Sequence, residues 1–237
     1  MNILAIGNSF SVDSTRYLHQ IARADGVNLQ AVSLHIGACS LERHYRNMLS
    51  EERAYELIYN GSPTGFKVSM KEALFNRQWD VITIQQCSPR SFEEDSYHPY
   101  IEELTAYIRK CAPAAKLYIH QTWMFEAESE KLRSTGYPTP QAMLDEVVKT
   151  YGTVAKEIGA DGIIRSGEMF GSLLQNGIPK IHRDTFHASY GLGRYALGLL
   201  WYHTLCSKDV TENGFCDFDE AVSKEEIEVI KRCVNAL

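Results

Sequence analysis

A serine stands at a predicted corner between a strand and a helix near the start of the 237-residue chain. The apolar run at residues 2–6 predicts a buried strand, and residues 7–11, GNSFS, lead into a helical pattern. A side chain at such a corner projects from the carboxyl edge of a sheet, where open α/β sheets bind ligands. Ser9 is therefore a candidate nucleophile. The alternative is that Ser9 and Ser11 only cap the helix, as serines commonly do.

A histidine and an aspartate near the other end supply the partners that a serine nucleophile requires. In residues 183–189, RDTFHAS, Asp184 and His187 come just before the apolar helical pattern of residues 190–206. A neutral hydroxyl is a poor nucleophile unless a base removes its proton, and a carboxylate improves the base by fixing its tautomer. The pair therefore predicts a base and its orienting acid. Taken alone, the D-x-x-H spacing also fits a helix cap with a surface histidine.

Short apolar runs that alternate with longer amphipathic stretches must position these side chains. The alternation is typical of β-α units, in which helices cover both faces of a parallel sheet. Gly26 and Gly159 stand where helix C-caps are expected. We predict five strands, at residues 2–6, 29–35, 81–85, 116–120 and 162–165. We predict helices at residues 13–24, 67–76, 99–111, 141–158, 190–206 and 224–234.

Two polar segments, residues 87–98 and 125–140, each follow a predicted strand. Both are expected at the edge of the sheet where ligands bind. The chain shows no internal repeat, no linker rich in Pro, Gly or Ser, and no jump in composition. We therefore expect residues 1–237 to form a single α/β domain, built as a three-layer α/β/α sandwich.

Composition and charge exclude several classes of partner. Hydrophobic residues make up 44% and charged residues 23%, which is typical of a globular chain. With a net charge of −6 and no basic cluster, nucleic acid is not an expected partner. The apolar stretch 195–206 is shorter than the ~20 residues of a membrane-spanning helix, so no membrane partner is expected either. The N-terminus lacks the pattern of a signal peptide, which fits a cytoplasmic protein or an exported one whose signal has been removed.

Cysteines and histidines do not form a metal-binding pattern. The cysteines, at positions 39, 87, 111, 206, 216 and 233, contain no C-x-x-C pair. No histidine pair has the spacing of a helical metal site. A flavodoxin-like sheet can also bind phosphate or flavin at its first loop, but residues 7–11 lack the glycines and hydroxyls that wrap a phosphate. We expect free thiols, no metal and no cofactor.

Residues 7–11 and the pair Asp184 and His187 resemble the first and last blocks of the SGNH (GDSL-like) hydrolase superfamily. Its usual Gly-Asp-Ser is here Gly-Asn-Ser, with Asn8 in place of the aspartate. The resemblance spans most of the chain and implies a flavodoxin-like sandwich of about five parallel strands. It implies Ser9 as nucleophile, His187 as general base and then acid, and Asp184 as the orienting carboxylate.

The resemblance also implies an oxyanion hole with three donors. Two are the backbone amides of Ser9 and of Gly37, a glycine that follows the second predicted strand. The third is usually an asparagine after the third strand, but Cys87 holds that position here. A glutamine amide has the same chemistry, and a bacterial branch of the superfamily carries Gln and Ser at this strand end. Because neighbouring strand residues face opposite ways, only one of Gln85 and Gln86 is expected to reach the site, with Gln85 ranked first.

The substrate implied by the resemblance is an ester, and first a carbohydrate O-acetyl ester, because many relatives act on acetylated glycans. His120 ends the fourth predicted strand, and Trp123 follows it. Both are expected to contact the substrate, with packing in the protein wall as the alternative. A lipase or thioesterase would need a long apolar channel, of which the sequence gives no clear sign. A catalytically silent glycan-binding protein on the same fold is the alternative from another class.

Overall fold

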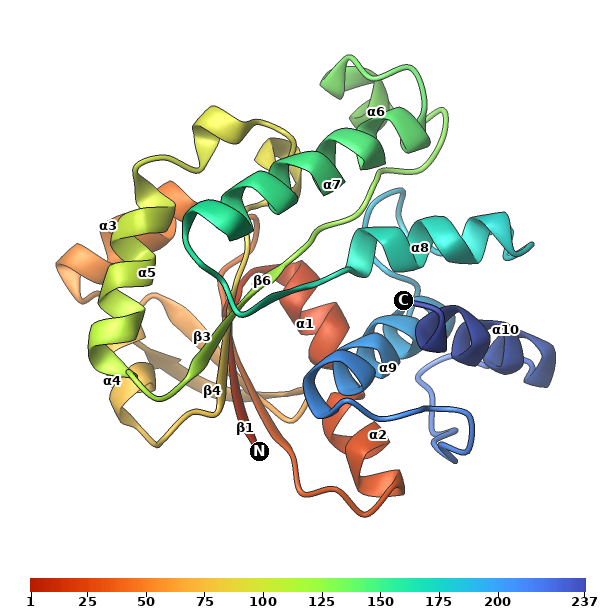
Figure 1. Cartoon of the computed structure of the whole chain (residues 1–237), viewed down its shortest axis with the longest axis horizontal. Coiled ribbons are helices and arrows are strands. Elements are labelled where there is room, and N and C mark those ends of the chain that lie inside the picture. The colour runs from red at the N-terminus through yellow and green to blue at the C-terminus, as the bar shows by residue number, and fades with distance from the viewer.

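A seven-stranded β-sheet forms the centre of the protein, and helices cover both of its faces (Figure 1). In the computed structural model, which describes residues 1–237, the strands are Asn2–Gly7 (β1), Gln30–His35 (β2), Tyr55–Tyr59 (β3), Ser62–Val68 (β4), Val81–Ile84 (β5), Lys116–His120 (β6) and Gly162–Ile164 (β7). Their order across the sheet is β4-β3-β2-β1-β5-β6-β7. The strands β2, β1, β5, β6 and β7 run parallel, whereas at one edge β3 pairs antiparallel with β2 and β4 pairs antiparallel with β3.

The parallel part of the sheet confirms the sequence prediction, because each predicted apolar run forms one of its five strands. β1 and β5 are buried along almost their whole length, as expected for strands covered on both faces. Numbered by themselves, the parallel strands have the order 2-1-3-4-5 of flavodoxin-like folds. The predicted α/β/α sandwich is therefore confirmed, with two strands more than expected.

Ten α-helices and two short 3₁₀ helices surround this sheet. They are Ser9–Thr15 (α1), Leu18–Ala24 (α2), Leu41–Ser50 (α3), Met70–Phe75 (α4), Ser88–Arg90 (η1), Glu94–Ser96 (η2), Tyr100–Cys111 (α5), Glu130–Thr135 (α6), Pro140–Glu157 (α7), Ser166–Gln175 (α8), Leu192–Cys206 (α9) and Lys224–Asn235 (α10). Four of the predicted helices correspond closely to α5, α7, α9 and α10. By contrast, α3, α6 and α8 have no counterpart among the predicted helices.

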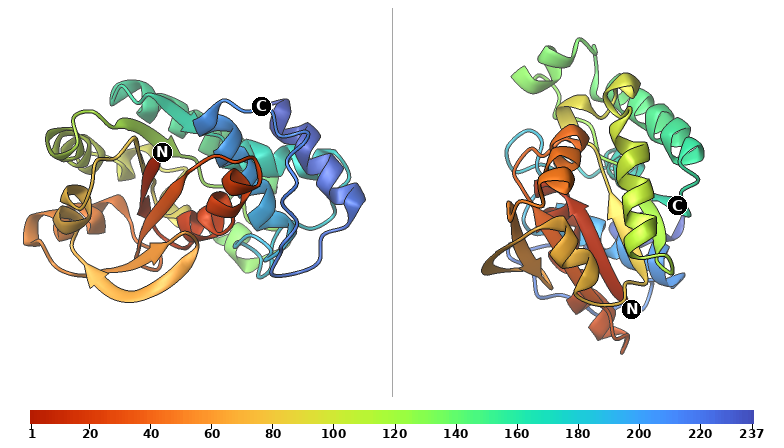
Figure 2. Two further views of the ribbon diagram at one scale, coloured as in Figure 1. Left: turned by 90° about the horizontal axis from the view of Figure 1, so that it is seen from below. Right: turned by 90° about the vertical axis from the view of Figure 1, so that its left-hand side faces the viewer.

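The helices form two layers. On one face of the sheet, α1 and α2 pack beside α9, and α10 packs against α9. On the other face, α3, α4 and α5 pack together, and α7 lies against β6 and β7. In Figure 1 the first group lies to the right of the sheet, and α3, α4 and α5 lie to its left. Figure 2 shows the two layers from two further directions. None of the helices combines the length and apolar character that crossing a bilayer requires.

The predicted helix over residues 13–24 is wrong in two respects. It is divided into α1 and α2, and α1 begins earlier than predicted, at Ser9. Near the break, the hydroxyls of Ser14 and Thr15 donate to carbonyls one turn earlier, at 2.9 and 2.8 Å. Such side-chain bonds slightly destabilise a helix and often bend it. The early start places Ser9 in the first turn of α1.

The predicted helix over residues 67–76 is also wrong at its start, because residues 67–68 belong to β4. The helix begins at Met70, after a reciprocal cap in which Ser69 accepts from the Glu72 backbone N–H and the Glu72 carboxylate accepts from the Ser69 N–H. Most side chains of β4 are exposed, so neither an apolar run nor a regular alternation marks this edge strand in the sequence.

Candidate active site

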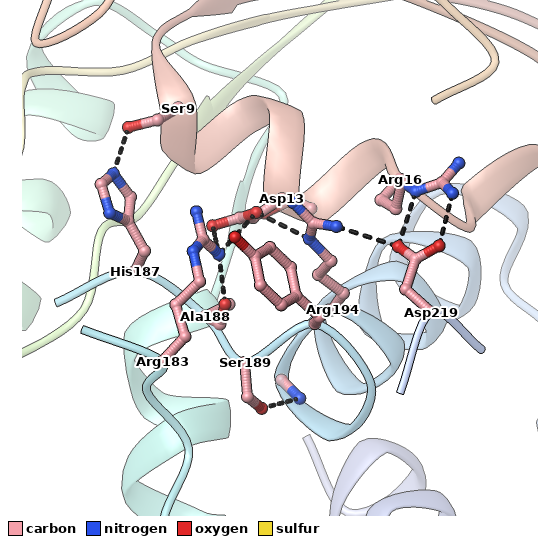
Figure 3. Close-up of polar contacts among 12 residues, drawn as sticks. Ser9, Asp13, Arg16, Arg183, His187, Ala188, Ser189, Arg194 and Asp219 are labelled. Carbon is pink, nitrogen blue, oxygen red and sulfur yellow. Dashed lines mark hydrogen bonds and ion pairs between the residues drawn. The ribbon is translucent and has the colours of Figure 1, made fainter. Parts of the chain in front are cut away.

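Side chains from distant parts of the chain meet at the carboxyl edge of the sheet. Nε2 of His187 lies 2.8 Å from Oγ of Ser9. Figure 3 shows the two side chains pointing toward each other. Nδ1 of the same ring lies 2.8 Å from Oδ2 of Asp184, whose other oxygen accepts the His187 backbone N–H at 2.9 Å. With its Nδ1–H held by a carboxylate, the ring presents a free lone pair at Nε2 to the serine hydroxyl. This arrangement is able to deprotonate Ser9 during a nucleophilic attack.

Hydrogen bonds from His187 keep the Asp184 carboxyl in its ionised form. Partial burial acts to raise the pKa of this carboxyl, but the hydrogen bonds from the His187 ring and backbone outweigh burial and hold the pKa below its ordinary value. Asp184 is therefore ionised at neutral pH, as a group that fixes a histidine tautomer must be.

The corner that presents Ser9 is built by Asn8, the N-cap of α1. Its Oδ1 accepts the Phe10 backbone N–H at 3.1 Å and the Gln85 Nε2–H at 2.9 Å. Its Nδ2 donates to the Cys39 carbonyl at 3.3 Å. An ionised aspartate accepts hydrogen bonds but has no N–H to give to that carbonyl. The buried partners thus give a physical reason for Gly-Asn-Ser in place of Gly-Asp-Ser.

Gly7 leaves room for a buried hydrogen bond beneath the corner. A Cβ added at Gly7 would collide with Oγ of Ser11 and lie 2.9 Å from Oε1 of Gln85. Those two atoms are hydrogen-bonded to each other, with the Ser11 hydroxyl as donor. The Ser11 hydroxyl is thus turned into the core, so Ser9 is the serine that this corner presents to the pocket.

The loop that carries His187 is tied to the helix that carries Ser9. The Arg183 guanidinium binds both oxygens of Asp13, at 2.9 and 3.0 Å, and also donates to the Ala188 carbonyl. Asp13 lies on α1, one turn after Ser9, and its side chain is only 1% exposed. Figure 3 shows this bridge between the two segments. Since Arg183 and Ala188 flank the loop, the bridge ties the segment that carries His187 to the helix that carries Ser9.

A second arginine extends this network. Nε of Arg194, on α9, donates to Oδ1 of Asp13 at 2.8 Å, and its Nη1 donates to Asp219 at 2.9 Å. Arg16 binds Asp219 from the other side, at 2.5 and 2.8 Å. No local sequence pattern predicts this network, because its members lie up to 181 residues apart in the chain.

Trp123 lies in the protein wall, which differs from its expected role in substrate contact. It is fully buried and stacks on Phe10, with ring centroids 3.8 Å apart and planes 8° from parallel. Its Nε1–H donates to the Phe186 carbonyl at 2.7 Å, next to His187 in the chain. Trp123 therefore contacts the loop that carries His187 through a hydrogen bond to Phe186, and it does not line the pocket.

His120 does not reach the pocket either. It is fully buried, with Nδ1 2.7 Å from Oε1 of Gln85 and Nε2 3.1 Å from Oγ of Ser166 and 3.3 Å from Oγ of Ser14. Burial lowers its pKa to about 3, so the ring is neutral at physiological pH. His120 is therefore a hydrogen-bonded residue of the protein wall, which was the alternative to the expected substrate contact.

The pocket at Ser9 encloses about 360 Å³. Its lining comprises Asn8, Ser9, Phe10, Gly37, Ala38, Cys87, Ser88, Pro89, Lys131, Phe186 and His187. The backbone N–H groups of Ser9 and Gly37 donate no hydrogen bond elsewhere in the chain, so both are free to bind an oxygen atom in the pocket. These are the two backbone donors expected for an oxyanion hole.

Neither glutamine lines this pocket, which is a correction to the expected third donor. Nε2 of Gln85 donates to Asn8, and Nε2 of Gln86 donates to the carbonyl and hydroxyl of Ser96, at 3.0 and 3.1 Å. Both glutamine side chains are fully buried. Burial is tolerated because neighbouring polar atoms form hydrogen bonds with the amide groups. Ser88, two residues farther along, lines the pocket, and its hydroxyl makes no hydrogen bond within the chain. The Ser88 hydroxyl, at the start of η1, is therefore available as a side-chain donor where the glutamine amides are not.

The thiols near the pocket are poorly suited to act as nucleophiles. Burial raises the pKa of Cys39 to about 12 and also raises that of Cys87, so both remain protonated at neutral pH. All six cysteines are free. No group of three or more His, Cys, Asp or Glu side chains is arranged to hold a metal ion.

Comparison with known proteins identifies the family of this chain. The model of the family described as "Domain of unknown function (DUF4886)" matches residues 2–236. The crystal structure of a DUF4886 family protein from Bacteroides uniformis has a TM-score of 0.92 and 29% identity, covering 100% of this chain and 93% of that one. No curated protein matches the sequence significantly.

More distant solved structures share the fold. A putative SGNH hydrolase from Slackia heliotrinireducens has a TM-score of 0.61 at 20% identity, covering 86% of this chain and 98% of that one. An acetylxylan esterase from Geobacillus stearothermophilus has a TM-score of 0.54 at 13% identity, covering 90% and 94%. Given the family match over almost the whole sequence, the chain belongs to the DUF4886 family, and its fold is that of the SGNH (GDSL-like) hydrolases.

Proposed function

We propose that the protein is a serine esterase that works through an acyl-enzyme at Ser9. The observation that carries this proposal is the unbroken hydrogen-bond chain from Ser9 through His187 to Asp184, with both steps at 2.8 Å. The chain ends at a pocket with two unpaired backbone N–H groups. A nucleophile, a base, an orienting acid and oxyanion donors are the parts that acyl transfer requires.

In the first half-reaction, Nε2 of His187 takes the proton of Ser9 as Oγ attacks the carbonyl carbon of the ester. The charge that develops on the carbonyl oxygen is stabilised by the amides of Ser9 and Gly37 and by the hydroxyl of Ser88. The bond to the alcohol oxygen then breaks, and His187 returns the proton to that oxygen. An acyl group on Ser9 and a free alcohol result.

In the second half-reaction, water replaces the alcohol. His187 takes a proton from the water as the water oxygen attacks the acyl carbon. The bond between the acyl carbon and Oγ of Ser9 then breaks. The proton returns to Ser9, which releases the carboxylic acid and restores the enzyme. Throughout the cycle, Asp184 stabilises the imidazolium form of His187 and remains ionised.

We propose an O-acetylated carbohydrate as the first choice of substrate. The acetylxylan esterase that shares the fold acts, by its name, on such an ester. The pocket is small, and most of its lining surface is apolar with a few hydroxyl and amide donors, which suits a short acyl chain. A lipase or thioesterase would need room for a long acyl chain, and this pocket encloses only about 360 Å³.

The proposal is tested with p-nitrophenyl acetate and a fluorophosphonate probe. We expect Ser9→Ala to lower kcat by several powers of ten and to abolish labelling, since members of a triad act as a unit. His187→Ala and Asp184→Asn should also lower kcat. Ser62→Ala, on the exposed strand β4, is the matched serine control and should retain activity.

Equal turnover by wild type and Ser9→Ala would refute the proposal. Turnover that survives Asp184→Asn but not His187→Ala would show that another group orients the base. A folded wild-type protein that binds acetylated glycans without hydrolysing them would instead support the silent glycan-binding alternative. A panel of acetylated sugars and longer acyl esters then tests the choice of substrate.

A further inference from the structure

The active-site pocket contains one lysine, on the short helix α6. Lys131 lines the same pocket as Ser9 and His187, and it is the one residue of that lining, apart from the base His187, with an ionisable cationic side chain. No aspartate or glutamate belongs to the lining. In a chain of net charge −6, the wall of the pocket therefore carries local positive charge.

The ammonium of Lys131 has no partner within the chain. The lysines that form ion pairs are Lys71, Lys149 and Lys231, each within 4.0 Å of a glutamate. The same three lysines are the ones whose ammonium groups donate hydrogen bonds. Lys131 is half-buried, so its charge is less exposed to solvent than that of a surface lysine but is not neutralised by an acid.

Aromatic rings hold the ammonium beside the base. Nζ of Lys131 lies 4.0 Å from the ring centroid of Phe186 and 6.0 Å from that of Phe125. The Phe186 ring is in turn 3.8 Å from the His187 ring, centroid to centroid. Cation–π contacts position a charge without cancelling it, because the ring carries no net charge. The Lys131 side chain is thus fixed at the pocket and still able to bind an anion.

The segment before α6 is joined to the loop of the base. The Glu126 backbone N–H donates to the Thr185 carbonyl at 2.7 Å, and Nε2 of His182 lies 3.0 Å from the Met124 carbonyl. Ser129 caps α6 by accepting the Leu132 backbone N–H at 3.1 Å. These bonds anchor the start of α6 at the pocket, so the place of Lys131 is part of the built site.

We propose that Lys131 binds a carboxylate on the ester substrate, so that the enzyme prefers esters with one negative charge on the acyl or the alcohol part. This inference rests on the esterase function proposed above and adds the substrate class. A single ammonium matches a single negative charge, whereas a phosphate group usually receives several charged or backbone donors. Among acylated carbohydrates, the class that fits is one with an acidic sugar or an acidic acyl group.

The test compares two matched pairs of substrates. The acyl side is tested by 4-nitrophenyl hemisuccinate against 4-nitrophenyl butyrate, and the alcohol side by 4-acetoxybenzoate against 4-acetoxybenzamide. The quantity of interest is the ratio of kcat/KM for the charged and the neutral ester. Hydrogen bonds to charged groups contribute enough that we expect Lys131→Met to lower this ratio about 10- to 100-fold in at least one pair.

Three further variants make the result specific. Lys131→Arg should retain most of the preference, and Lys131→Glu should reverse it. Lys71→Met, which removes a lysine of α4 paired with Glu51, is the matched control and should leave the ratio unchanged. The preference of the wild type should also weaken as salt is added, since salt screens a charge at a pocket open to solvent.

An unchanged ratio in both pairs for Lys131→Met would overturn the inference while leaving the esterase proposal intact. Failure of the esterase proposal is seen separately, as neutral esters turned over no faster by wild type than by Ser9→Ala. In that case the anion site at Lys131 is tested by the binding of 4-hydroxybenzoate, measured by calorimetry. Weaker binding by Lys131→Met than by wild type supports the anion site, and equal affinity or no binding by either refutes it.

Discussion

Substitution of Asp13 by asparagine tests whether the buried ion pairs hold the base in place. Asp13→Asn keeps the shape of the side chain but removes the charge that Arg183 and Arg194 share. Breaking a buried ion pair costs about 3–5 kcal/mol because the remaining charge is left buried without a partner. The arginine side chains are 19% and 13% exposed, and Arg194 keeps Asp219, so we take the lower end, about 3 kcal/mol.

That loss sets the size of the expected thermal shift. For a chain of this length, each kcal/mol lowers Tm by about 2–4 °C, so Asp13→Asn should lower Tm by roughly 6–12 °C. Thermal unfolding followed by circular dichroism measures this change. A fall in kcat with little change in KM should accompany it at temperatures where the variant is folded, because the loop of His187 is no longer tied to α1.

The control is Asp219→Asn at the outer end of the same network. Asp219 is 30% exposed and binds Arg16 and Arg194, and an exposed pair contributes about 1 kcal/mol or less. It makes no contact with the loop of the base, so kcat should be retained. Equal Tm shifts for the two variants would refute the reasoning about burial. A large Tm shift for Asp13→Asn with unchanged kcat would show that the network stabilises the fold without positioning the base.

Three other changes have definite outcomes. Ser88→Ala should lower kcat about 100-fold in steady-state assays if its hydroxyl is an oxyanion donor, and an unchanged kcat would exclude that role. Asn8→Asp should destabilise the protein by about 1–3 kcal/mol in urea unfolding, because a buried carbonyl loses its donor, and equal stability would contradict this account of the asparagine. Burial lowers the pKa of His44 and of His120 to about 3 and that of His182 to about 4. Histidine in an unfolded chain titrates near 6.5. At pH values between about 4 and 6.5 the unfolded chain therefore binds more protons than the folded one. Stability should therefore be full above about pH 6.5 and fall at lower pH by up to about 4 kcal/mol per pH unit, with a shallower slope in His120→Gln.

The parallel strands were predictable because burial on both faces demands continuous apolar runs, which a sequence shows directly. The edge hairpin of β3 and β4 was not, since β4 is largely exposed and its neighbours determine its conformation. Ser9, Asp184 and His187 were predictable by residue type and by their places at predicted strand and helix ends. The structure brings these three side chains together.

The orientations of Gln85 and Gln86 were beyond the sequence, because side-chain direction depends on partners far along the chain. Gln85 is held by Asn8, 77 residues earlier. The bridge between Asp13 and Arg183 likewise spans 170 residues, and no local pattern marks such a pair. Trp123 and His120 follow or end a strand at the ligand edge, as expected, but their side chains turn into the wall, where aromatic stacking and buried polar groups hold them.

The separation of Ser9 from His187 has a consequence for biosynthesis. The ribosome produces Ser9 178 residues before His187, and α9, which packs on α1, comes later still. A partly synthesised chain therefore cannot assemble the triad, however well its first strands have formed. Hydrolytic activity would appear only near the end of translation. Turnover would therefore indicate that the C-terminal segment with His187 and α9 has packed against the N-terminal segment with Ser9 and α1.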